Sequence, residues 1–236
     1  MLRYLALTLV FGCGDDSSRH IVDAAALVCD PTPAPATCAR LGPDFMSTAQ
    51  GANPSGPWSY GYTPTLGGAF TVYALYFAGT DATLEGLDVW ASPDIVDTQG
   101  AHLPALGINA TTMVSDPIGT YTVDPGQILA HPGQSGQYSV ARWTAAAAGV
   151  YRVQATFGGL SGVNNNPPTT TDVHVQHDGS ELAADEVTVY GPTGAACHAT
   201  SVSVVSGDTI DFAVGFGGND YLHDSTSIDA VVCPAS

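Results

Sequence analysis

The chain of 236 residues contains no lysine, and its five basic residues, all arginine, face twenty-two aspartates and glutamates. The formal net charge is −17 at pH 7. Binding to a phosphate backbone or an anionic lipid surface needs clustered cations, so this composition argues strongly against nucleic acid and excludes anionic lipid surfaces as partners. Charged residues make up only 11% and hydrophobic residues 44%, whereas disorder needs high charge and few apolar residues. The sequence therefore predicts a folded, acidic protein.

Long apolar runs are also missing. The N-terminal run covers residues 4–11 and is far shorter than the ~18 residues that cross a bilayer. Gly12 and Cys13 follow it directly, and a small residue before a cysteine at this place resembles the signal peptide of bacterial lipoproteins. The resemblance implies a signal peptide over residues 1–12, a lipid on Cys13, and an exported protein that contacts the membrane only through this anchor. A plain secretory leader that is cleaved nearby is the alternative.

Cysteine is scarce, and no C-x-x-C pair is present, which argues against a zinc site. If Cys13 carries a lipid, four cysteines remain, and an even number in an oxidising compartment indicates two disulfides with three alternative pairings. Spacing favours Cys29–Cys38, which closes a short proline-rich loop, and Cys197–Cys233, which ties the C-terminus back. The alternation of side chains along each expected strand places Cys197 and Cys233 on outward faces of neighbouring strands.

The pattern changes at residue 44. Residues 13–43 are rich in Asp, Ser, Ala and Pro with little periodicity, so we expect a tether there and one domain over residues 44–236. In that domain, short runs of period two are separated by Gly, Pro, Asn and Asp turn formers. We expect strands at residues 69–77, 149–157, 169–176, 201–205, 209–216 and 227–232. No helical stripe is sustained, and many short strands predict an all-β fold, an antiparallel jelly-roll β-sandwich.

Several short motifs occur in an order that resembles a module of exported bacterial proteins. This module is similar to the galactose-binding, carbohydrate-binding-module class of jelly-roll sandwiches. The motifs span about residues 44–232 and are Gly56 to Tyr62, His131-Pro132-Gly133, Tyr138 to Ala145, Ala147 to Tyr151, Thr169 to Val175, Gly207 to Gly215, and Asp224-Ser225-Thr226. The resemblance implies sugar binding at the level of the fold and no catalytic residue.

Three aromatic residues are candidates for a sugar-binding surface. Trp58, Tyr60 and Tyr62 alternate beside glycines, and aromatic faces commonly cover the C–H surfaces of sugars. Period two places all three on one side of a strand, which suits a core face equally well. Exposure of Trp58 or Tyr60 in a groove would favour sugar binding, and full burial of both would favour a scaffold.

A second candidate combines His131, at a strand end, with Asp172 and His174, which share the outward face of one strand. Imidazole and carboxylate groups form a possible ligand-binding or metal set. The alternative is a hydrogen-bonded polar cluster that fixes a loop.

Aspartate supplies nineteen of the twenty-two acids, and five aspartates crowd the C-terminal region beside glycines. Oxygen-rich loops suit calcium, which the resembled class often carries as a structural ion, so Asp224 and Asp229 are the expected calcium ligands. Solvated turn aspartates are the alternative. Asp211 points opposite to its apolar neighbours, and we expect it to pair with Arg142.

Motifs of the common hydrolases and nucleotide-binding enzymes are absent from the sequence. We therefore expect a non-catalytic, lipid-anchored surface module that binds glycans. The alternative is a structural or adhesive lipoprotein that contacts other proteins, and a hydrolase is a distant third possibility.

Overall fold

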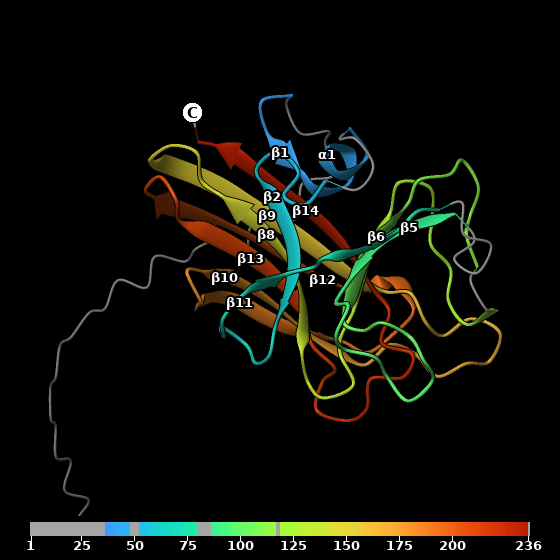
Figure 1. Cartoon of the computed structure of the whole chain (residues 1–236). Coiled ribbons are helices and arrows are strands. Elements are labelled where there is room, and N and C mark those ends of the chain that lie inside the picture. The colour runs from blue at the N-terminus through green and yellow to red at the C-terminus, as the bar shows by residue number, and fades with distance from the viewer. Residues whose placement is uncertain (1–35, 48–51, 80–85, 117–118, 236) are drawn as a thin grey trace, which may run out of the picture.

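The computed structural model describes residues 36–47, 52–79, 86–116 and 119–235. The expected signal peptide, Cys13 and Cys29 lie outside the described residues. Two antiparallel sheets pack face to face, which confirms the predicted all-β sandwich (Figure 1). Within the described part of the chain, no helix has the length and apolar character needed to cross a membrane.

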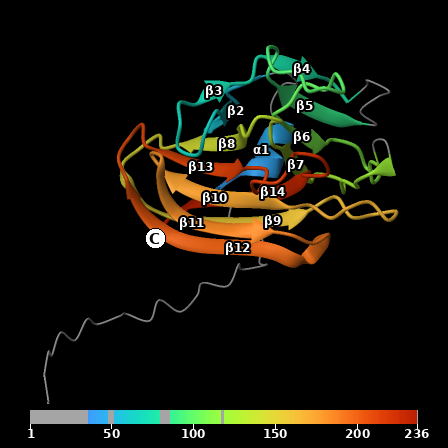
Figure 2. The ribbon, with the colours of Figure 1, turned by 90° about the horizontal axis from the view of Figure 1, so that it is seen from below.

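The larger sheet has eight strands, in the order β12-β9-β14-β7-β6-β5-β4, with β1 beside β14. Their bounds are β1 Ala39–Arg40, β4 Leu75–Phe77, β5 Leu87–Ala91, β6 Ala105–Asn109, β7 Ile128–His131, β9 Gly149–Gly159, β12 Gly191–Val204 and β14 Thr226–Pro234. The smaller sheet has six strands in the order β11-β10-β13-β8-β2-β3. These are β2 Trp58–Thr63, β3 Thr71–Val72, β8 Tyr138–Thr144, β10 Thr171–His177, β11 Ser180–Val187 and β13 Thr209–Val214. Figure 2 shows β12 and β11 at one edge of the sandwich and β3 and β4 at the other.

The core follows from the alternation of side chains along each strand. Val153, Ala155 and Phe157 of β9 are buried, and β9 pairs with β14 so that Ala230 and Ile228 face the same way. Phe212 of β13 closes the core from the other sheet. The residues between these positions point away from the core, and they form the outer faces on which ligands can bind.

Residues 69–77 form two strands instead of the single predicted strand. β3 pairs with β2 in the smaller sheet, whereas β4 pairs with β5 in the larger one. Tyr73 lies between them, is buried, and donates a hydrogen bond from its hydroxyl to Ser139 Oγ at 3.1 Å. The chain changes sheets at this buried tyrosine, a step that period-two patterning does not reveal.

The folded part begins before the expected boundary at residue 44. β1 pairs with β14, and the short helix α1, Leu41–Ser47, follows it directly. Asp44 of this helix accepts hydrogen bonds on Oδ2 from the Arg40 backbone at 2.8 Å and from Trp58 Nε1 at 3.0 Å. The end of the predicted tether is therefore part of the sandwich.

The predicted disulfides are wrong, because Cys38 is bonded to Cys233. Ala39 pairs with Val232 in the β1–β14 register, which places Cys38 opposite Cys233. Cys197 does not reach Cys233, because β9 separates β12 from β14. Cys197 is itself disulfide-bonded. Pairing Cys29 with Cys38 is excluded by the same bond.

Candidate functional site

The predicted aromatic surface is part of the core. Trp58 is 0% exposed and Tyr60 is 1% exposed, so neither can stack on a sugar, and the interpretation of these two residues as ligand-binding is wrong. The Trp58 indole is satisfied by Asp44, and Tyr60 packs on the ring of Phe45 at a centroid distance of 4.6 Å. Tyr62 continues the row and is half-buried. The helix α1 covers these rings, and a helix of seven residues leaves little signal in the sequence.

His131, Asp172 and His174 do not form one set. His131 ends β7 in the larger sheet, whereas Asp172 and His174 are on β10 in the smaller sheet. The Nδ1 atom of His131 lies 2.9 Å from the Pro132 carbonyl oxygen, and burial lowers the pKa of this histidine. A metal site shared by these three side chains is therefore wrong.

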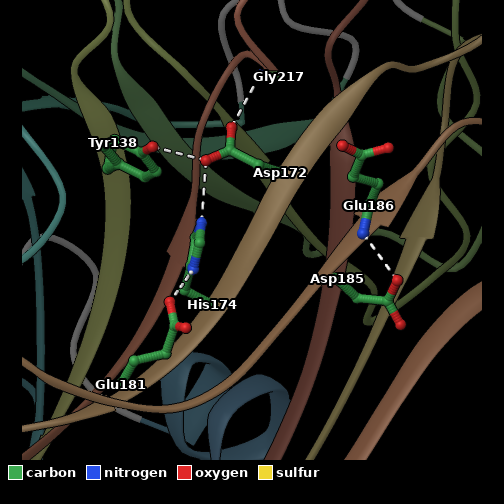
Figure 3. A network of polar contacts seen from close by, with 7 residues as sticks. All are labelled: Tyr138, Asp172, His174, Glu181, Asp185, Glu186 and Gly217. Atoms are coloured by element: carbon green, nitrogen blue, oxygen red, sulfur yellow. Dashed lines mark hydrogen bonds and ion pairs between the residues drawn. The ribbon is translucent and has the colours of Figure 1, made fainter.

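Asp172 and His174 instead belong to a polar network on the outer face of the smaller sheet (Figure 3). His174 Nε2 lies 2.9 Å from Asp172 Oδ2, and its Nδ1 lies 2.8 Å from Glu181 Oε2. The Tyr138 hydroxyl donates to Asp172 Oδ2 at 2.5 Å, and the Gly217 backbone donates to Asp172 Oδ1 at 2.8 Å. Both carboxylate oxygens and both imidazole nitrogens are engaged, so the network fixes the loop after β13.

The charges in this network stabilise each other. Burial alone would raise the pKa of Asp172, but hydrogen bonds from His174, Tyr138 and Gly217 lower it to about 2. Burial alone would lower the pKa of His174, yet its hydrogen bonds with Asp172 and Glu181 raise it above the usual value. The arrangement is an ion-paired cluster in which both Asp172 oxygens and both His174 nitrogens are engaged.

The predicted pair of Arg142 and Asp211 is confirmed. Arg142 donates from Nε and from its terminal nitrogen to the two Asp211 oxygens, each at 2.7 Å. The guanidinium also lies 4.1 Å from the centre of the Phe70 ring. Paired and stacked in this way, Arg142 is held on the sheet surface.

The two expected calcium ligands have different surroundings. Asp224 is 0% exposed, and its Oδ1 accepts hydrogen bonds from the Thr170 backbone at 2.9 Å and the Thr170 hydroxyl at 3.0 Å. Asp229 is further along β14, opposite Thr156, on the outer face of the larger sheet. Three residues of a strand span about 10 Å, so Asp229 lies well away from the start of β14 and from Asp224 before it. A calcium ion shared by this pair does not fit.

Another group of side chains lies close enough together to bind a metal ion. His177, Asp178 and Asp208 offer ligand atoms that all lie within 4.8 Å of one another, the only such group among the described residues. His177 Nε2 lies 3.2 Å from Asp208 Oδ2, and Asp178 Oδ1 accepts from the Thr209 backbone at 2.8 Å. This group joins the turn between β10 and β11 to the turn before β13.

A groove of about 520 Å³ lies on the outer face of the larger sheet, where β9 and β14 are neighbours. We call it the β9–β14 groove. The two strands form its floor, and its walls come from the start of α1, the segment before β7 and the start of β12. The described residues that line it are Gly42, Pro43, Thr122, Asp124, Pro125, Gly126, Gln127, Ile128, Thr156, Gly158, Gly159, Leu160, Tyr190, Gly191, Ala195, Ser227, Ile228 and Asp229.

The glycines give the groove its shape. A Cβ on Gly159 would meet the Val189 carbonyl oxygen at 2.2 Å, so only glycine lets the chain before β12 cross β9 this closely. A Cβ on Gly162 would meet Tyr190 Cβ at 2.8 Å. These close approaches place Tyr190 at the groove, 43% exposed, with its hydroxyl 3.1 Å from Thr122 Oγ1.

The floor and walls also carry polar groups. Ser227 Oγ donates to the Gly158 carbonyl at 3.1 Å, and Gln127 Oε1 accepts from the Asp124 backbone at 2.9 Å. No described residue forms a hydrogen bond or an ion pair with the Asp229 carboxylate, and the surrounding protein raises its pKa through burial alone. An aromatic wall beside polar groups with free bonding capacity can bind a polyhydroxylated ligand.

Sequence reasoning missed this groove. The sequence indicates Asp229 only as a metal ligand, and Tyr190 shows no pattern that separates it from other turn residues. The adjacent glycines Gly158 and Gly159 inside a strand are the one available signal, because interior strand glycines often mark a close backbone approach.

No protein-family model matches the sequence, and no curated protein sequence matches it significantly. Among solved structures, the chain is similar to a family 51 carbohydrate-binding module of a family 95 glycoside hydrolase from Clostridium perfringens, in complex with methyl-galactose. That pair has a TM-score of 0.34 and 12% identity, over 69% of this chain and 94% of that chain. A family 35 carbohydrate-binding module from Clostridium thermocellum has a TM-score of 0.29 and 10% sequence identity, over 68% of this chain and 98% of that chain. The family 35 module from Paenibacillus barcinonensis has a TM-score of 0.29 and 13% sequence identity, over 69% of this chain and 100% of that chain. No residue role is transferred from these structures.

Proposed function

We propose that this protein is a non-catalytic, exported module that binds carbohydrate in the β9–β14 groove. The observation that carries the proposal is the combination of an aromatic wall, Tyr190, with the unengaged carboxylate of Asp229 in one open groove. Its volume of about 520 Å³ lies within the range of small-ligand sites.

The chemistry of the groove suits a sugar ring. The exposed tyrosine ring offers an apolar face for the C–H side of a sugar. Thr156, Ser227 and Asp229 alternate on the floor and offer hydroxyl and carboxylate groups to the sugar hydroxyls. Small glycine positions between them leave room for the ligand to approach the backbone.

A glycan array on the purified full chain, followed by calorimetry with the best ligand, tests the proposal. Tyr190→Ala should weaken binding at least tenfold, because it removes the stacking face. Tyr190→Phe keeps the ring and loses only the bond to Thr122, so it should stay within about threefold of the wild type.

The matched control is Tyr62→Ala, which makes the same change on the other sheet and should leave binding intact. Loss of binding in Tyr62→Ala with none in Tyr190→Ala would move the site to the smaller sheet and overturn the groove. An array on which no glycan binds would reject sugar binding itself.

The second candidate function is a structural or adhesive surface role. The full burial of Trp58 and Tyr60 favours it, because these rings support the core and contact no ligand. Under this alternative the array stays negative, and a purified surface protein binds the chain in a way that Tyr190→Ala does not alter.

The anchor is a further part of the proposal, with the lipid on Cys13. Substitution Cys13→Ser should shift the protein from the detergent phase to the aqueous phase in a partition assay. If the variant still follows the detergent, the lipid is not on this cysteine.

A structural cation is a separate proposal, favoured by the group of His177, Asp178 and Asp208. Calcium takes carboxylate oxygens, and zinc also takes imidazole nitrogen, so both ions are added separately to metal-free protein. A bound ion should raise the melting midpoint, and Asp178→Asn should abolish the gain. Unchanged midpoints with both ions would show that the hydrogen bonds alone hold these turns.

A further inference from the structure

The described residues that line the β9–β14 groove carry charge of one sign. Asp124 and Asp229 are acidic, and none of the described lining residues is an arginine or a histidine. The whole chain adds to this field, with a formal net charge of −17 and no lysine. A ligand that enters the groove therefore meets a negative potential that nothing in its described lining offsets.

Asp229 is exposed on the outer face of the larger sheet, and it differs from the paired acids of the smaller sheet. Asp211 is paired with Arg142, and Asp172 is paired with His174. The carboxylate of Asp229 has no such partner among the described residues; the residue is exposed on the groove floor, and the neighbouring protein raises its pKa. The ionised form of such a carboxylate is stabilised most by a ligand that carries a positive charge.

The position of Asp229 suits contact with a sugar substituent. It stands on the floor strand β14, opposite Thr156 of β9, while Tyr190 belongs to the wall. A sugar stacked on the wall directs its equatorial substituents along the plane of its ring, toward the floor. An ammonium substituent there would form a charge-assisted hydrogen bond with the carboxylate.

We propose that the groove selects amino sugars, whose ammonium group pairs with Asp229, and that it rejects uronic acids, whose carboxylate meets Asp124 and Asp229. This inference rests on the proposed function, since it names the class of sugar that the same groove takes. The selection is electrostatic, so it should weaken as salt screens the charges.

Three soluble tetrasaccharide probes of equal length test the proposal by calorimetry with the full chain at pH 7. They are a glucosamine oligomer, its N-acetylated counterpart, and a glucuronic acid oligomer. The wild type should bind the glucosamine probe at least tenfold more tightly than the N-acetylated one, and it should not bind the uronic acid probe measurably. The ratio of the first two affinities should fall severalfold between 20 mM and 500 mM salt.

Asp229→Asn should reduce that affinity ratio to about two or less. The matched control is Asp94→Asn, because Asp94 is an exposed loop acid outside the groove and its replacement changes the net charge equally. The control should keep the ratio of the wild type. An equal loss of the ratio in both variants would show a general charge effect and overturn the role of Asp229.

The outcomes separate this inference from the proposed function. Equal or tighter binding of the N-acetylated probe by the wild type would overturn the amino-sugar selection while the groove keeps its sugar. Binding of the uronic acid probe would overturn the rejection of anionic sugars. If none of the probes and no glycan of the array binds, the proposed function fails, and this inference fails with it.

Discussion

Asp224 is a buried carboxyl with one satisfied and one unsatisfied oxygen. Its Oδ1 accepts two hydrogen bonds from Thr170, whereas its Oδ2 has no hydrogen-bond partner among the described residues. Burial raises its pKa to about 6 from 3.8, and the hydrogen bonds from Thr170 only partly oppose this. The folded protein therefore contains a carboxyl group that stays protonated up to about pH 6, whereas an ordinary aspartate ionises near pH 4.

This acid predicts a pH-dependent loss of stability. The folded state binds the proton of Asp224 more tightly than the unfolded state, so its contribution is fully present below pH 4 and is lost as the pH rises through about 6. Two pKa units correspond to roughly 3 kcal/mol. We expect Asp224→Asn to raise the free energy of unfolding by about 1–3 kcal/mol at pH 8 and to change it little at pH 4. Urea titrations at both pH values measure this, and an equal effect at the two would contradict it.

His174 predicts a pH-dependent loss of stability in the same direction, at higher pH than that of Asp224. Its pKa is raised by the hydrogen bonds with Asp172 and Glu181, which outweigh the effect of burial. The stabilisation is fully present below pH 6.5 and is lost as the pH rises through the raised folded pKa. His174→Gln should cost about 2 kcal/mol at pH 5.5, a typical value for a hydrogen bond to a charged group, and clearly less at pH 9.

Denaturant titrations of the His174 variant at the two pH values check this difference. His102→Gln is the control, since the His102 ring contacts a backbone carbonyl, Ser92 O, at 3.0 Å and the Phe77 ring, whereas His174 contacts two carboxylates. A uniform loss at both pH values would mean that His174 acts through packing alone.

At the scale of elements, β1 and β14, the first and last strands of the described chain, stabilise each other by strand pairing and by a disulfide. β1 contributes two residues to the larger sheet, and the Cys38–Cys233 bond fixes it there over a sequence separation of 195. Closing so long a loop restricts the unfolded chain strongly. The short strand would have little stability of its own, so the disulfide and α1 together keep the N-terminal end of the domain in place.

Replacing both cysteines, Cys38→Ser with Cys233→Ser, should lower the free energy of unfolding by roughly 2–5 kcal/mol. Non-reducing peptide mapping of the wild type should recover the Cys38 and Cys233 peptides as one linked species. A linked Cys197–Cys233 species would contradict the pairing.

The crossing of β9 by the chain before β12 predicts a second effect. Gly159→Ala would place a Cβ 2.2 Å from the Val189 carbonyl oxygen and 3.0 Å from Thr169. The backbone must shift, so we expect a loss of about 2–3 kcal/mol in unfolding free energy, together with weaker glycan binding as Tyr190 moves. Thermal melts and calorimetry measure the two effects.

Gly149→Ala is the matched control on the same strand, because its nearest neighbour, Tyr151, would be at an ordinary 3.4 Å. It should change stability by no more than about 0.5 kcal/mol. If the two variants behaved alike, the close approach at Gly159 would not determine the shape of the groove.

For the whole molecule, sequence patterning predicted the sheet architecture and left the site open. Period two in β9 correctly separates buried Val153 and Phe157 from outward Thr156. The same period could not decide whether Trp58 and Tyr60 are core or surface, because the helix that covers them is defined by only seven residues. The groove depends on the packing of α1, β7 and β12 around β9 and β14. Those contacts join segments that are not adjacent in the sequence, such as α1 and β14, and no local pattern encodes them.

The bond between Cys38 and Cys233 also decides how mechanical tension passes through the molecule. Everything from Ala39 to Val232 lies inside the covalent loop that this bond closes. Tension between the two chain ends therefore runs through the sulfur atoms and peels no strand from either sheet. Asp229 is four residues before Cys233 on the same strand. Force applied to a ligand in the groove would therefore be transmitted along β14 to Cys233, then through the disulfide to Cys38 and the segment before it. A protein that is held to a surface at its N-terminal end would resist shear along this short path.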